Sequence, residues 1–484
     1  MRNYHTVHLL RKPTSVARLL KARSFLRNRP VTRRKRRTVS LRYGLLLMGL
    51  ILNSFGFVWG QARSSAANFT FGGKLIVAVS DADMVPSAYY DGHLGPAEGA
   101  DALSVIRLDR PVRELRATEI GVSNSVTGPP AVVAVTPDGR YAIVAERLGP
   151  RPSGKTDPRM DDLPVGRTLT VVDLSDPERP RVVQRLPGPE RANAVSINAD
   201  GSLVAVCGQP LNPGQSPLVL YRFAGGQLTN PVAPALPEWT PGDILRDARF
   251  HPTENTLALL NLTKPALSFV SVRDTSGPLT LARLGNAIGV DKAPFLARFT
   301  PDGRHVVVNG SYGAADVVDA GGGQPRGLVA TVRFRADTSA EGTPRHQYVS
   351  HALTGVNPEG MTISPDGQWV VTANLERSAN PLDRPQQGYF SSLTLLRLDA
   401  RTGLLDRVGD FPFDGIMPES VVFDNTSRYL AVTTFDHYDE KQAGGSIDFW
   451  RLVGDYYDSR RTELVKTNYS VPVTRGVHSM VIVR

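Results

Sequence analysis

A five-residue turn sequence recurs along this chain and constrains its fold more than any other feature. It reads TPDGR at 136–140 and 300–304, NADGS at 198–202 and SPDGQ at 364–368, with looser copies HPTEN at 251–255 and DNTSR at 424–428. In the Pro-Asp-Gly form, Pro fixes φ at the first turn position, Asp bonds its own backbone, and Gly takes the left-handed conformation. Apolar residues alternate on both sides of each copy, which predicts a β-hairpin at each one.

The spacing of the turn indicates the architecture. Successive copies lie 49–64 residues apart, and two further short apolar runs follow each hairpin, such as 168–174 and 181–186 after the first. Four strands per unit, repeated radially, form the blades of a β-propeller. A β-sandwich rarely repeats one turn at a long, steady period, and a β-helix has a period of ~20–30 residues or fewer. We therefore predict an all-β propeller.

Two segments near the ends of the chain resemble parts of one further blade. Residues 478–483 (HSMVIV) are typical of an innermost strand, and residues 74–80 (KLIVAVS) are typical of the second strand beside it. Six internal repeats and this composite blade predict seven four-stranded blades, closed by pairing of the N- and C-terminal strands in one blade. Such closure removes free sheet edges. The predicted propeller spans residues 73–484 and follows a linker at 63–72.

The N-terminal segment differs in composition from the rest of the chain. Fourteen of the 56 Lys and Arg residues lie within residues 1–43, which hold no acidic residue, so the remainder carries 42 basic against 46 acidic groups. The net charge of +10 therefore reflects this leader. The remaining domain is mildly acidic, and we expect no nucleic-acid binding.

The leader also carries the features of an export signal. An apolar core at 44–59 follows the basic region and precedes Gly60, Gln61 and Ala62. This order predicts a signal peptide within residues 1–62, cleaved near Ala62, and hence a periplasmic, cell-surface or extracellular protein. An uncleaved leader would act as a membrane anchor, the only membrane contact that we expect. A mitochondrial presequence is the other alternative, although the apolar core favours export.

The single cysteine bears on compartment and packing. Cys207 lies in the strand-like sequence LVAVCG, and with no second Cys the chain forms no internal disulfide. A chain of this length can bury an ample core without disulfides, so this is compatible with export. We predict that Cys207 is a small buried apolar residue, and that the protein is a monomer.

The register of the turns predicts which residues surround one mouth of the central channel. The residue five positions before each turn, with its equivalent in the composite blade, should lie there: Ala131, Asn193, Arg246, Phe295, Glu359, Glu419 and His478. The tight turns lie on the opposite face. The long loops lie on the same face as this mouth, at 81–102, 147–167, 311–327, 375–390 and 436–444. Function usually concentrates on such loops of a rigid scaffold, so this long-loop face is the predicted functional surface.

Four residues at this mouth form the predicted catalytic set. Glu359, Glu419 and His478 could perform acid/base chemistry or hold a divalent cation, and Arg246 could hold a carboxylate or phosphate. Asn193 joins these four as a predicted binding residue. Alternatively, polar residues here only solvate the channel, and both Glu side chains bond loop backbone.

Acidic loops near the same blades are weaker candidates for metal binding. They contain Asp81, Asp83, Asp91 and His93 in one loop and Asp436, His437, Asp439 and Glu440 in another. Acidic loops are mostly solvated surface, so carboxylates in sequence proximity do not by themselves indicate a metal site.

The repeat resembles those of the YVTN-type repeat propellers and the seven-bladed lactonase-like family. The closest stretch is 358–374 (PEGMTISPDGQWVVTAN), and the resemblance extends over residues 73–484. It implies a seven-bladed propeller. It also implies that Arg246, Glu359, Glu419 and His478 match the Glu, Arg and His used by such lactonases at the channel mouth. The export leader, the long loops, Ala131 and Phe295 depart from that family.

Two functions fit these features. We favour an exported propeller that binds a small molecule or a protein through its long-loop face and channel mouth, and that requires no cofactor. The alternative is a lactonase-like hydrolase in which Glu359 or Glu419 is the base and Arg246 holds the oxyanion or carboxylate. A redox protein is disfavoured because the sequence has no haem-attachment motif or Cys/Met ligand motif.

Overall fold

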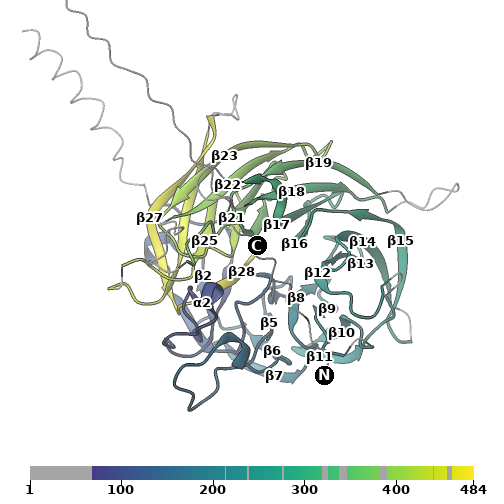
Figure 1. Cartoon of the computed structure of the whole chain (residues 1–484), viewed down its shortest axis with the longest axis horizontal. Helices are drawn as coiled ribbons and strands as arrows, with labels where there is room; N and C mark the ends of the chain where they lie inside the picture. Colours follow the sequence, from purple (N-terminus) through teal and green to yellow (C-terminus); the bar gives the residue numbers. More distant parts are fainter. Residues whose placement is uncertain are drawn as a thin grey trace, which may run out of the picture. The chain divides into compact units, whose positions relative to one another are not determined.

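Antiparallel strands form seven four-stranded sheets in the part of the chain that the structure describes, which confirms the predicted seven-bladed propeller (Figure 1). The structure is a computed structural model that describes residues 68–484 except 213, 237–238, 275–276, 319–324, 337–345, 381–389, 440 and 455–460. Contacts divide the chain into two units, 1–65 and 66–484. The predicted leader lies outside the described residues. No described helix is long and apolar enough to cross a membrane.

Each blade runs from an innermost strand at the channel to an outermost strand at the rim. The first three blades are β28 (Val477–Val483), β1 (Leu75–Ser80), β2 (Ala102–Arg107) and β3 (Ala117–Gly121); β4 (Val133–Val135), β5 (Tyr141–Ala145), β6 (Thr168–Asp173) and β7 (Arg181–Pro187); and β8 (Ala192–Ile197), β9 (Leu203–Gly208), β10 (Leu218–Ala224) and β11 (Gln227–Val232).

The other four blades follow in chain order. They are β12 (Leu245–Phe250), β13 (Thr256–Asn261), β14 (Ala266–Arg273) and β15 (Thr280–Gly289); β16 (Pro294–Phe299), β17 (His305–Val318), β18 (Pro325–Arg333) and β19 (Gln347–Leu353); β20 (Pro358–Ile363), β21 (Trp369–Asn374), β22 (Ser391–Leu398) and β23 (Leu405–Phe413); and β24 (Val421–Phe423), β25 (Tyr429–Thr434), β26 (Gly445–Val453) and β27 (Glu463–Val473). The short helices α2 (Ala88–Asp91), η1 (Val112–Glu114) and η2 (Met160–Asp162) lie in connections.

All six predicted turns join the first and second strands of a blade. In the first, Asp138 Oδ1 accepts a hydrogen bond from the backbone N–H of Arg140 at 3.0 Å, and Gly139 has φ 78°. The looser copy at 424–428 uses Ser427, with φ 59°, in the left-handed position that Gly occupies in the four Asp-Gly copies. The local chemistry that identified the turn in the sequence therefore operates in the structure.

The blade formed by the two ends of the domain closes the ring. Strand β28 is antiparallel to β1, and Leu75 pairs with Val483 and Val77 with Val481. This confirms the predicted terminal closure. Phe71, in the segment predicted as a linker, is fully buried and packs edge-on against Phe449, so the chain contacts the propeller before β1 begins.

The hydrophobic core lies between neighbouring blades. In one cluster, Ile143 and Val171 of one blade pack with Val204 and Tyr221 of the next. Because alternating strand residues point to opposite sheet faces, each blade can contribute apolar side chains to two such layers. Cys207 is fully buried in another layer, as predicted.

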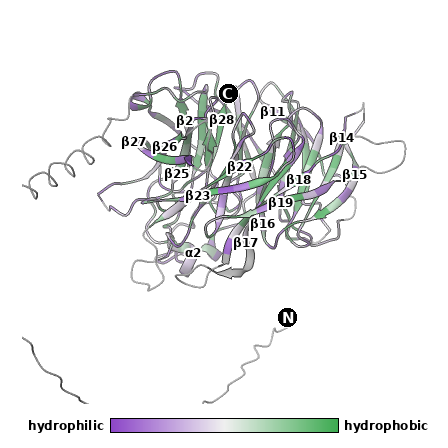
Figure 2. Cartoon of the chain, turned by 90° about the horizontal axis from the view of Figure 1, so that it is seen from above, coloured by the Kyte–Doolittle hydropathy of each residue, from purple (hydrophilic) through white to green (hydrophobic). Residues whose placement is uncertain are grey.

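The central strands run between two different faces. Figure 2 shows α2 and the C-terminal end of β28 on opposite sides of the propeller.

The loop segment predicted at 311–327 was placed wrongly, because β17 continues to Val318 and β18 begins at Pro325. A longer hairpin therefore replaces most of this expected loop.

Candidate active site at the long-loop mouth

A pocket of about 320 Å³ lies at the long-loop mouth of the channel. Strand β12 contributes Arg246, β16 contributes Phe295, β20 contributes Glu359, and the loop containing α2 contributes Tyr89. Strand β16 also contributes Pro294, and β17 contributes Ser311. The remaining lining residues come from the connections after second strands and before first strands: Tyr90, Leu262, Ala293, Asn357, Leu375, Glu376, Ala379 and Asn380. Three residues that the turn register aligned, Arg246, Phe295 and Glu359, therefore meet in one pocket.

Arg246 and Glu359 are opposite charges that influence each other without forming an ion pair. Burial raises the pKa of Glu359 to about 7, and the positive charge of Arg246 opposes this rise. Burial lowers the pKa of Arg246, and Glu359 partly offsets that change. No nitrogen of Arg246 lies within 4.0 Å of a Glu359 carboxylate oxygen. A small polar ligand could therefore lie between the two side chains.

Arg246 has unusual surroundings for a largely buried cation. Its Nε is buried and makes no hydrogen bond with the described residues, and its guanidinium lies 4.4 Å from the ring centre of Phe295. The aromatic face attracts the cation but accepts no conventional hydrogen bond. Donors therefore remain available for a carboxylate or an oxyanion in the pocket.

Glu419 is fully buried and does not line the pocket. Neither of its carboxylate oxygens has a hydrogen-bond partner among the described residues. Burial raises its pKa well above the ordinary value, with further contributions from Glu359 and Asp81, while neighbouring Tyr89 opposes the shift. The Tyr89 hydroxyl donates its hydrogen bond to the carbonyl oxygen of Val126 at 2.9 Å. Burial and the nearby carboxylates therefore favour the protonated form of Glu419.

His478 is also fully buried, and its interactions define its tautomer. Its Nε2 lies 2.7 Å from Oδ1 of Asn124. The Asn124 amide group donates to the carbonyl oxygens of Ser80 at 3.0 Å and Val122 at 2.9 Å, so Oδ1 is the acceptor and His478 Nε2 carries the proton. Burial lowers the pKa of His478 to about 3. The imidazole is thus neutral, and its buried Nδ1 has no described partner.

Asn193 serves the scaffold. Its Oδ1 accepts a hydrogen bond from Arg147, and its Nδ2 donates to the carbonyl oxygen of Leu245 at 2.8 Å, which joins β8 to β12. Burial lowers the pKa of Arg147 to about 10, and the positive charges of Arg246 and Arg191 contribute further. Arg147 therefore brings additional positive charge to this side of the channel.

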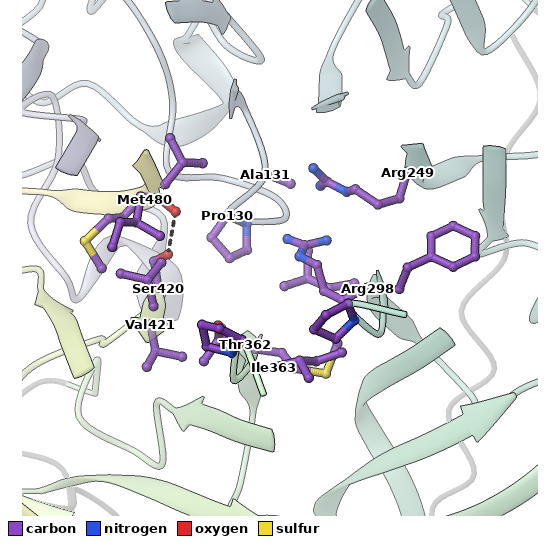
Figure 3. A pocket seen from close by; sticks show the side chains of 18 of the residues that line it. Pro130, Ala131, Arg249, Arg298, Thr362, Ile363, Ser420, Val421 and Met480 are labelled. Carbon is purple, nitrogen blue, oxygen red and sulfur yellow. Dashed lines mark hydrogen bonds between the residues drawn. The ribbon is translucent and has the colours of Figure 1, made fainter. Parts of the chain in front are cut away.

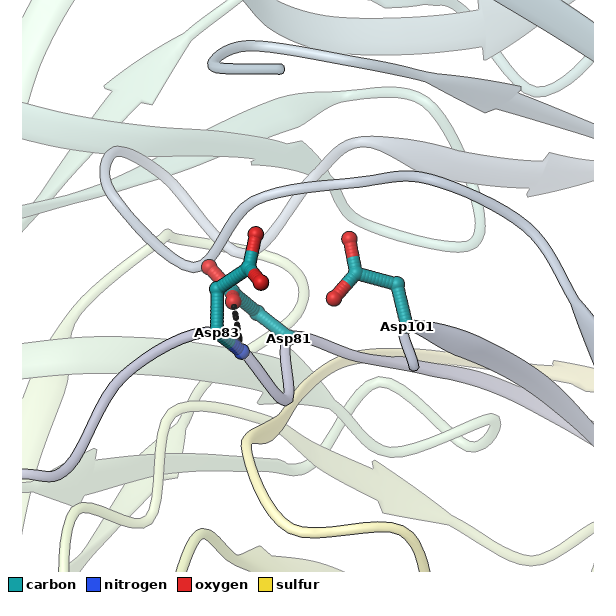
Figure 4. Close-up of side chains that lie close together, drawn as sticks. All are labelled: Asp81, Asp83 and Asp101. Atoms are coloured by element: carbon teal, nitrogen blue, oxygen red, sulfur yellow. Dashed lines mark hydrogen bonds between the residues drawn. The ribbon is translucent and has the colours of Figure 1, made fainter. Parts of the chain in front are cut away.

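Three carboxylates from the composite blade form a separate cluster. Ligand atoms of Asp81, Asp83 and Asp101 all lie within 4.8 Å of one another, and Figure 4 shows the three side chains converging. Burial raises the pKa of Asp101 to about 8 and that of Asp81 to about 6. Oxygen ligands of this kind could hold a divalent cation. Asp101 lay outside the predicted acidic set, because the turn repeat gave no spatial register for the connection before β2.

The other predicted metal ligands are not brought together. Among the described residues, only the three-Asp cluster meets the distance condition, so Glu359, Glu419 and His478 do not form a comparable group.

Asp91 and His93, two of the weaker metal-ligand candidates, contact residues of neighbouring loop segments instead. His93 Nδ1 lies 3.1 Å from Asp157, and Asp91 accepts the backbone N–H of His93 at 2.9 Å.

In the second acidic loop, Asp436 accepts a hydrogen bond from the backbone N–H of His437 at 2.7 Å. Asp439 accepts one from the backbone N–H of Lys441 at 3.1 Å. Glu440 lies outside the described residues.

Sequence comparison gives no further assignment, since no family model and no curated protein matches the chain. Solved structures do match. A candidate 6-phosphogluconolactonase from Bacteroides uniformis has a TM-score of 0.56 at 11% identity, covering 85% of this chain and 100% of its own. The periplasmic gluconolactonase of Pseudomonas aeruginosa has a TM-score of 0.54 at 15% identity, with 84% and 99% covered.

A third match differs in its described activity. A hypothetical selenium-binding protein from Sulfolobus tokodaii has a TM-score of 0.53 at 9% identity, covering 85% of this chain and 94% of its own. At these identities the likeness concerns the fold alone, because one fold can support unrelated chemistry. The chain has the seven-bladed propeller fold found in lactonase-like proteins.

Proposed function

We propose that the protein is an exported hydrolase of small cyclic esters that acts at the long-loop mouth. The observation that carries this proposal is the pairing of Glu359, whose pKa burial raises to about 7, with Arg246 in one pocket without direct contact. A base with a pKa near the working pH is suited to accept a proton from water. The lactonase-like fold of structural neighbours supports the same chemistry.

In the proposed reaction, Glu359 accepts a proton from a water molecule that attacks the lactone carbonyl carbon. The guanidinium of Arg246 donates hydrogen bonds to the developing oxyanion. When the tetrahedral intermediate collapses, the ring C–O bond breaks and the leaving alkoxide takes the proton from Glu359. Lactone and water thus give one hydroxy acid, with no cofactor.

Glu419 and His478 would not contact the substrate in this proposal. Both are fully buried and do not line the pocket. Burial raises the pKa of Glu419 and so favours its protonated form, which would place no second negative charge near Glu359. The protein would act as a monomer on a small molecule, and the long-loop face would provide access.

The test measures hydrolysis of five- and six-membered sugar lactones, aliphatic lactones and aryl esters. Glu359→Gln and Arg246→Met should each lower kcat/KM about 100-fold or more. In the native protein, kcat/KM should rise with pH through about 7, as Glu359 ionises, and Glu359→Gln should remove that rise. Glu254→Gln and Arg304→Met, exposed on the opposite face, are charge-matched controls. Absence of turnover across the panel, or full activity in Glu359→Gln, would overturn the proposal.

A binding module without turnover is the second candidate. It is favoured by the engagement of two ring residues in internal hydrogen bonds, Asn193 with Arg147 and His478 with Asn124. In that case a hydroxy acid should bind without any lactone being hydrolysed, and Arg246→Met should abolish binding.

A further inference from the structure

A second cavity, of about 490 Å³, lies where the channel meets the face with the tight turns. Residues of three predicted turns line it, namely Pro252, Thr300, Pro301 and Pro365. It is therefore at the opposite end of the channel from the pocket with Arg246 and Glu359. Ala131, which the turn register aligned with the long-loop mouth, lines this cavity instead.

Two arginines on neighbouring innermost strands share one buried carboxylate at this cavity. The carboxylate of Asp247 is fully buried. Its Oδ1 accepts a hydrogen bond from Nη2 of Arg249 at 3.0 Å, and its Oδ2 accepts one from Nη1 of Arg298 at 2.8 Å. The backbone N–H of Ala297 also donates to Oδ2, at 3.0 Å. A single carboxylate therefore faces two guanidinium groups, and this trio carries a net positive charge.

The trio leaves hydrogen-bond donors unused. Arg249 also donates Nη1 to the carbonyl oxygen of Val195 at 3.2 Å, and its buried Nε has no partner among the described residues. The hydrogen bonds of Arg298 all come from Nη1, which donates to Asp247 and, at 2.8 Å, to the carbonyl oxygen of Ala297. Figure 3 shows both side chains extending into the cavity beside Pro130. Both side chains are only partly exposed, with exposed fractions of 18% for Arg249 and 23% for Arg298.

The rest of the lining indicates what kind of anion would fit. A third cation, Arg484, lines the cavity, and no Asp or Glu among the described residues does. Asp424 lies close enough to Arg484 to influence its pKa, so the excess positive charge centres on Arg249 and Arg298. Most other lining side chains are apolar, among them Leu296, Phe299, Met361, Ile363, Val421 and Met480. An inorganic anion would leave this apolar surface uncovered, whereas an organic acid would contact it.

We propose that this cavity is a binding site for an organic carboxylate with an apolar body, held by Arg298 and Arg249. The carboxylate would accept hydrogen bonds from Nε and Nη2 of Arg298, and Arg249 would contribute its positive charge. The apolar portion of the ligand would pack along Met361 and Met480. A monoanion would neutralise the excess charge of the trio. The site is independent of the proposed hydrolase function, since it lies at the other mouth and uses none of the same residues.

The binding test compares 4-phenylbutanoate with its uncharged analogue 4-phenylbutanamide by calorimetry on the full protein. The acid should bind at least about tenfold more tightly than the amide, because the amide offers no charge to the two arginines. Inorganic phosphate should bind more weakly than the acid. Equal binding of acid and amide, or tighter binding of phosphate, would overturn the proposed ligand class.

Variants and a local probe test the position of the site. Arg298→Met should weaken binding of the acid at least about tenfold, whereas Arg304→Met, a 71%-exposed arginine of an adjacent turn, should change it less than about twofold. If Arg298→Met fails to fold, Arg298→Gln, whose amide can still donate to Asp247, should show the same loss. Methyl signals of Met361 and Met480 should shift on binding, and those of Met84 and Met417 should not. Unchanged affinity in a folded Arg298 variant, or shifts confined to Met84 and Met417, would refute the site.

Discussion

His478 and Asn124 form a buried hydrogen bond of 2.7 Å between two residues that lie 354 positions apart in the chain. The bond links the innermost strand of the composite blade to the connection that follows its outermost strand. Because the Asn124 amide protons are already donated to Ser80 and Val122, the proton between the two side chains must belong to His478.

The tautomer of His478 can be checked directly. Burial lowers its pKa to about 3, so we expect a neutral Nε2–H imidazole throughout the range from pH 5 to 8. Nitrogen-15 spectra of the histidine rings should include a His478 signal that has this tautomer and does not titrate in that range. His478→Gln assigns the signal. A fully protonated ring at pH 5 would contradict this arrangement.

Asn124 should be important for stability. Asn124→Leu removes the hydrogen bonds to Ser80, Val122 and His478 and leaves these buried groups unsatisfied. We expect the free energy of unfolding to fall by about 2–4 kcal/mol, measured by denaturant titration. A loss below about 1 kcal/mol would mean that water or a rearrangement satisfies these groups.

The close approach of β20 to the segment before β24 can be tested at Gly360. A Cβ at this position would lie 2.7 Å from the carbonyl oxygen of Glu419, so Gly360→Ala must push the two backbones apart. We expect a loss of about 1–3 kcal/mol in stability, together with reduced lactone turnover, because Glu359 is the adjacent residue. Gly289→Ala, where a Cβ meets nothing within 4 Å, is the matched control. Equal stability of the two variants would contradict the close packing.

The three-Asp cluster predicts how stability depends on pH. Burial raises the pKa of Asp101 to about 8 and that of Asp81 to about 6, so these groups stay protonated in the folded chain at pH values where the unfolded chain has lost the protons. Their stabilising effect is full below their ordinary pKa of about 3.9 and is lost as the pH rises through about 6 and about 8. The lowered pKa of His478 has the opposite effect on stability, because its stabilising contribution is lost as the pH falls below about 6.5.

We therefore expect Tm to decrease between pH 6 and pH 9 in the presence of a chelator, since a bound cation would keep the carboxylates ionised. Asp101→Asn should reduce this dependence without abolishing it, because Glu359, whose pKa burial raises to about 7, titrates in the same interval. A Tm that is constant or rises over that interval would show that the cluster is already ionised at pH 6.

Cys207 provides a simple check of the core. It is fully buried, and burial raises the pKa of its thiol. A thiol reagent should therefore leave it unmodified in the native protein and label it fully in denaturant. Rapid labelling under native conditions would show that this layer between blades opens.

The turn repeat explains why so much of the fold could be predicted. A period with fixed chemistry places each innermost strand in register, so Arg246, Phe295 and Glu359 could be aligned before their contacts were known. The same register could not find Tyr89, Arg147 or Asn124, which lie in connections without a repeat. It also could not predict that Glu419 is covered, because the covering residues, such as Tyr89, come from a loop of another blade. Burial of a channel residue depends on such long-range neighbours.

The pairing of Leu75 with Val483 indicates when the candidate site forms during folding. Six blades are each continuous in sequence and can form from local hairpins, whereas the seventh needs contact between distant segments and carries the largest loop-closure entropy. Asp81, Asn124 and His478 all belong to this seventh blade or its connections. The interior behind the long-loop mouth is therefore completed only when the ring closes. A partly folded intermediate could hold six finished blades and still lack the environment that raises the pKa of Glu419.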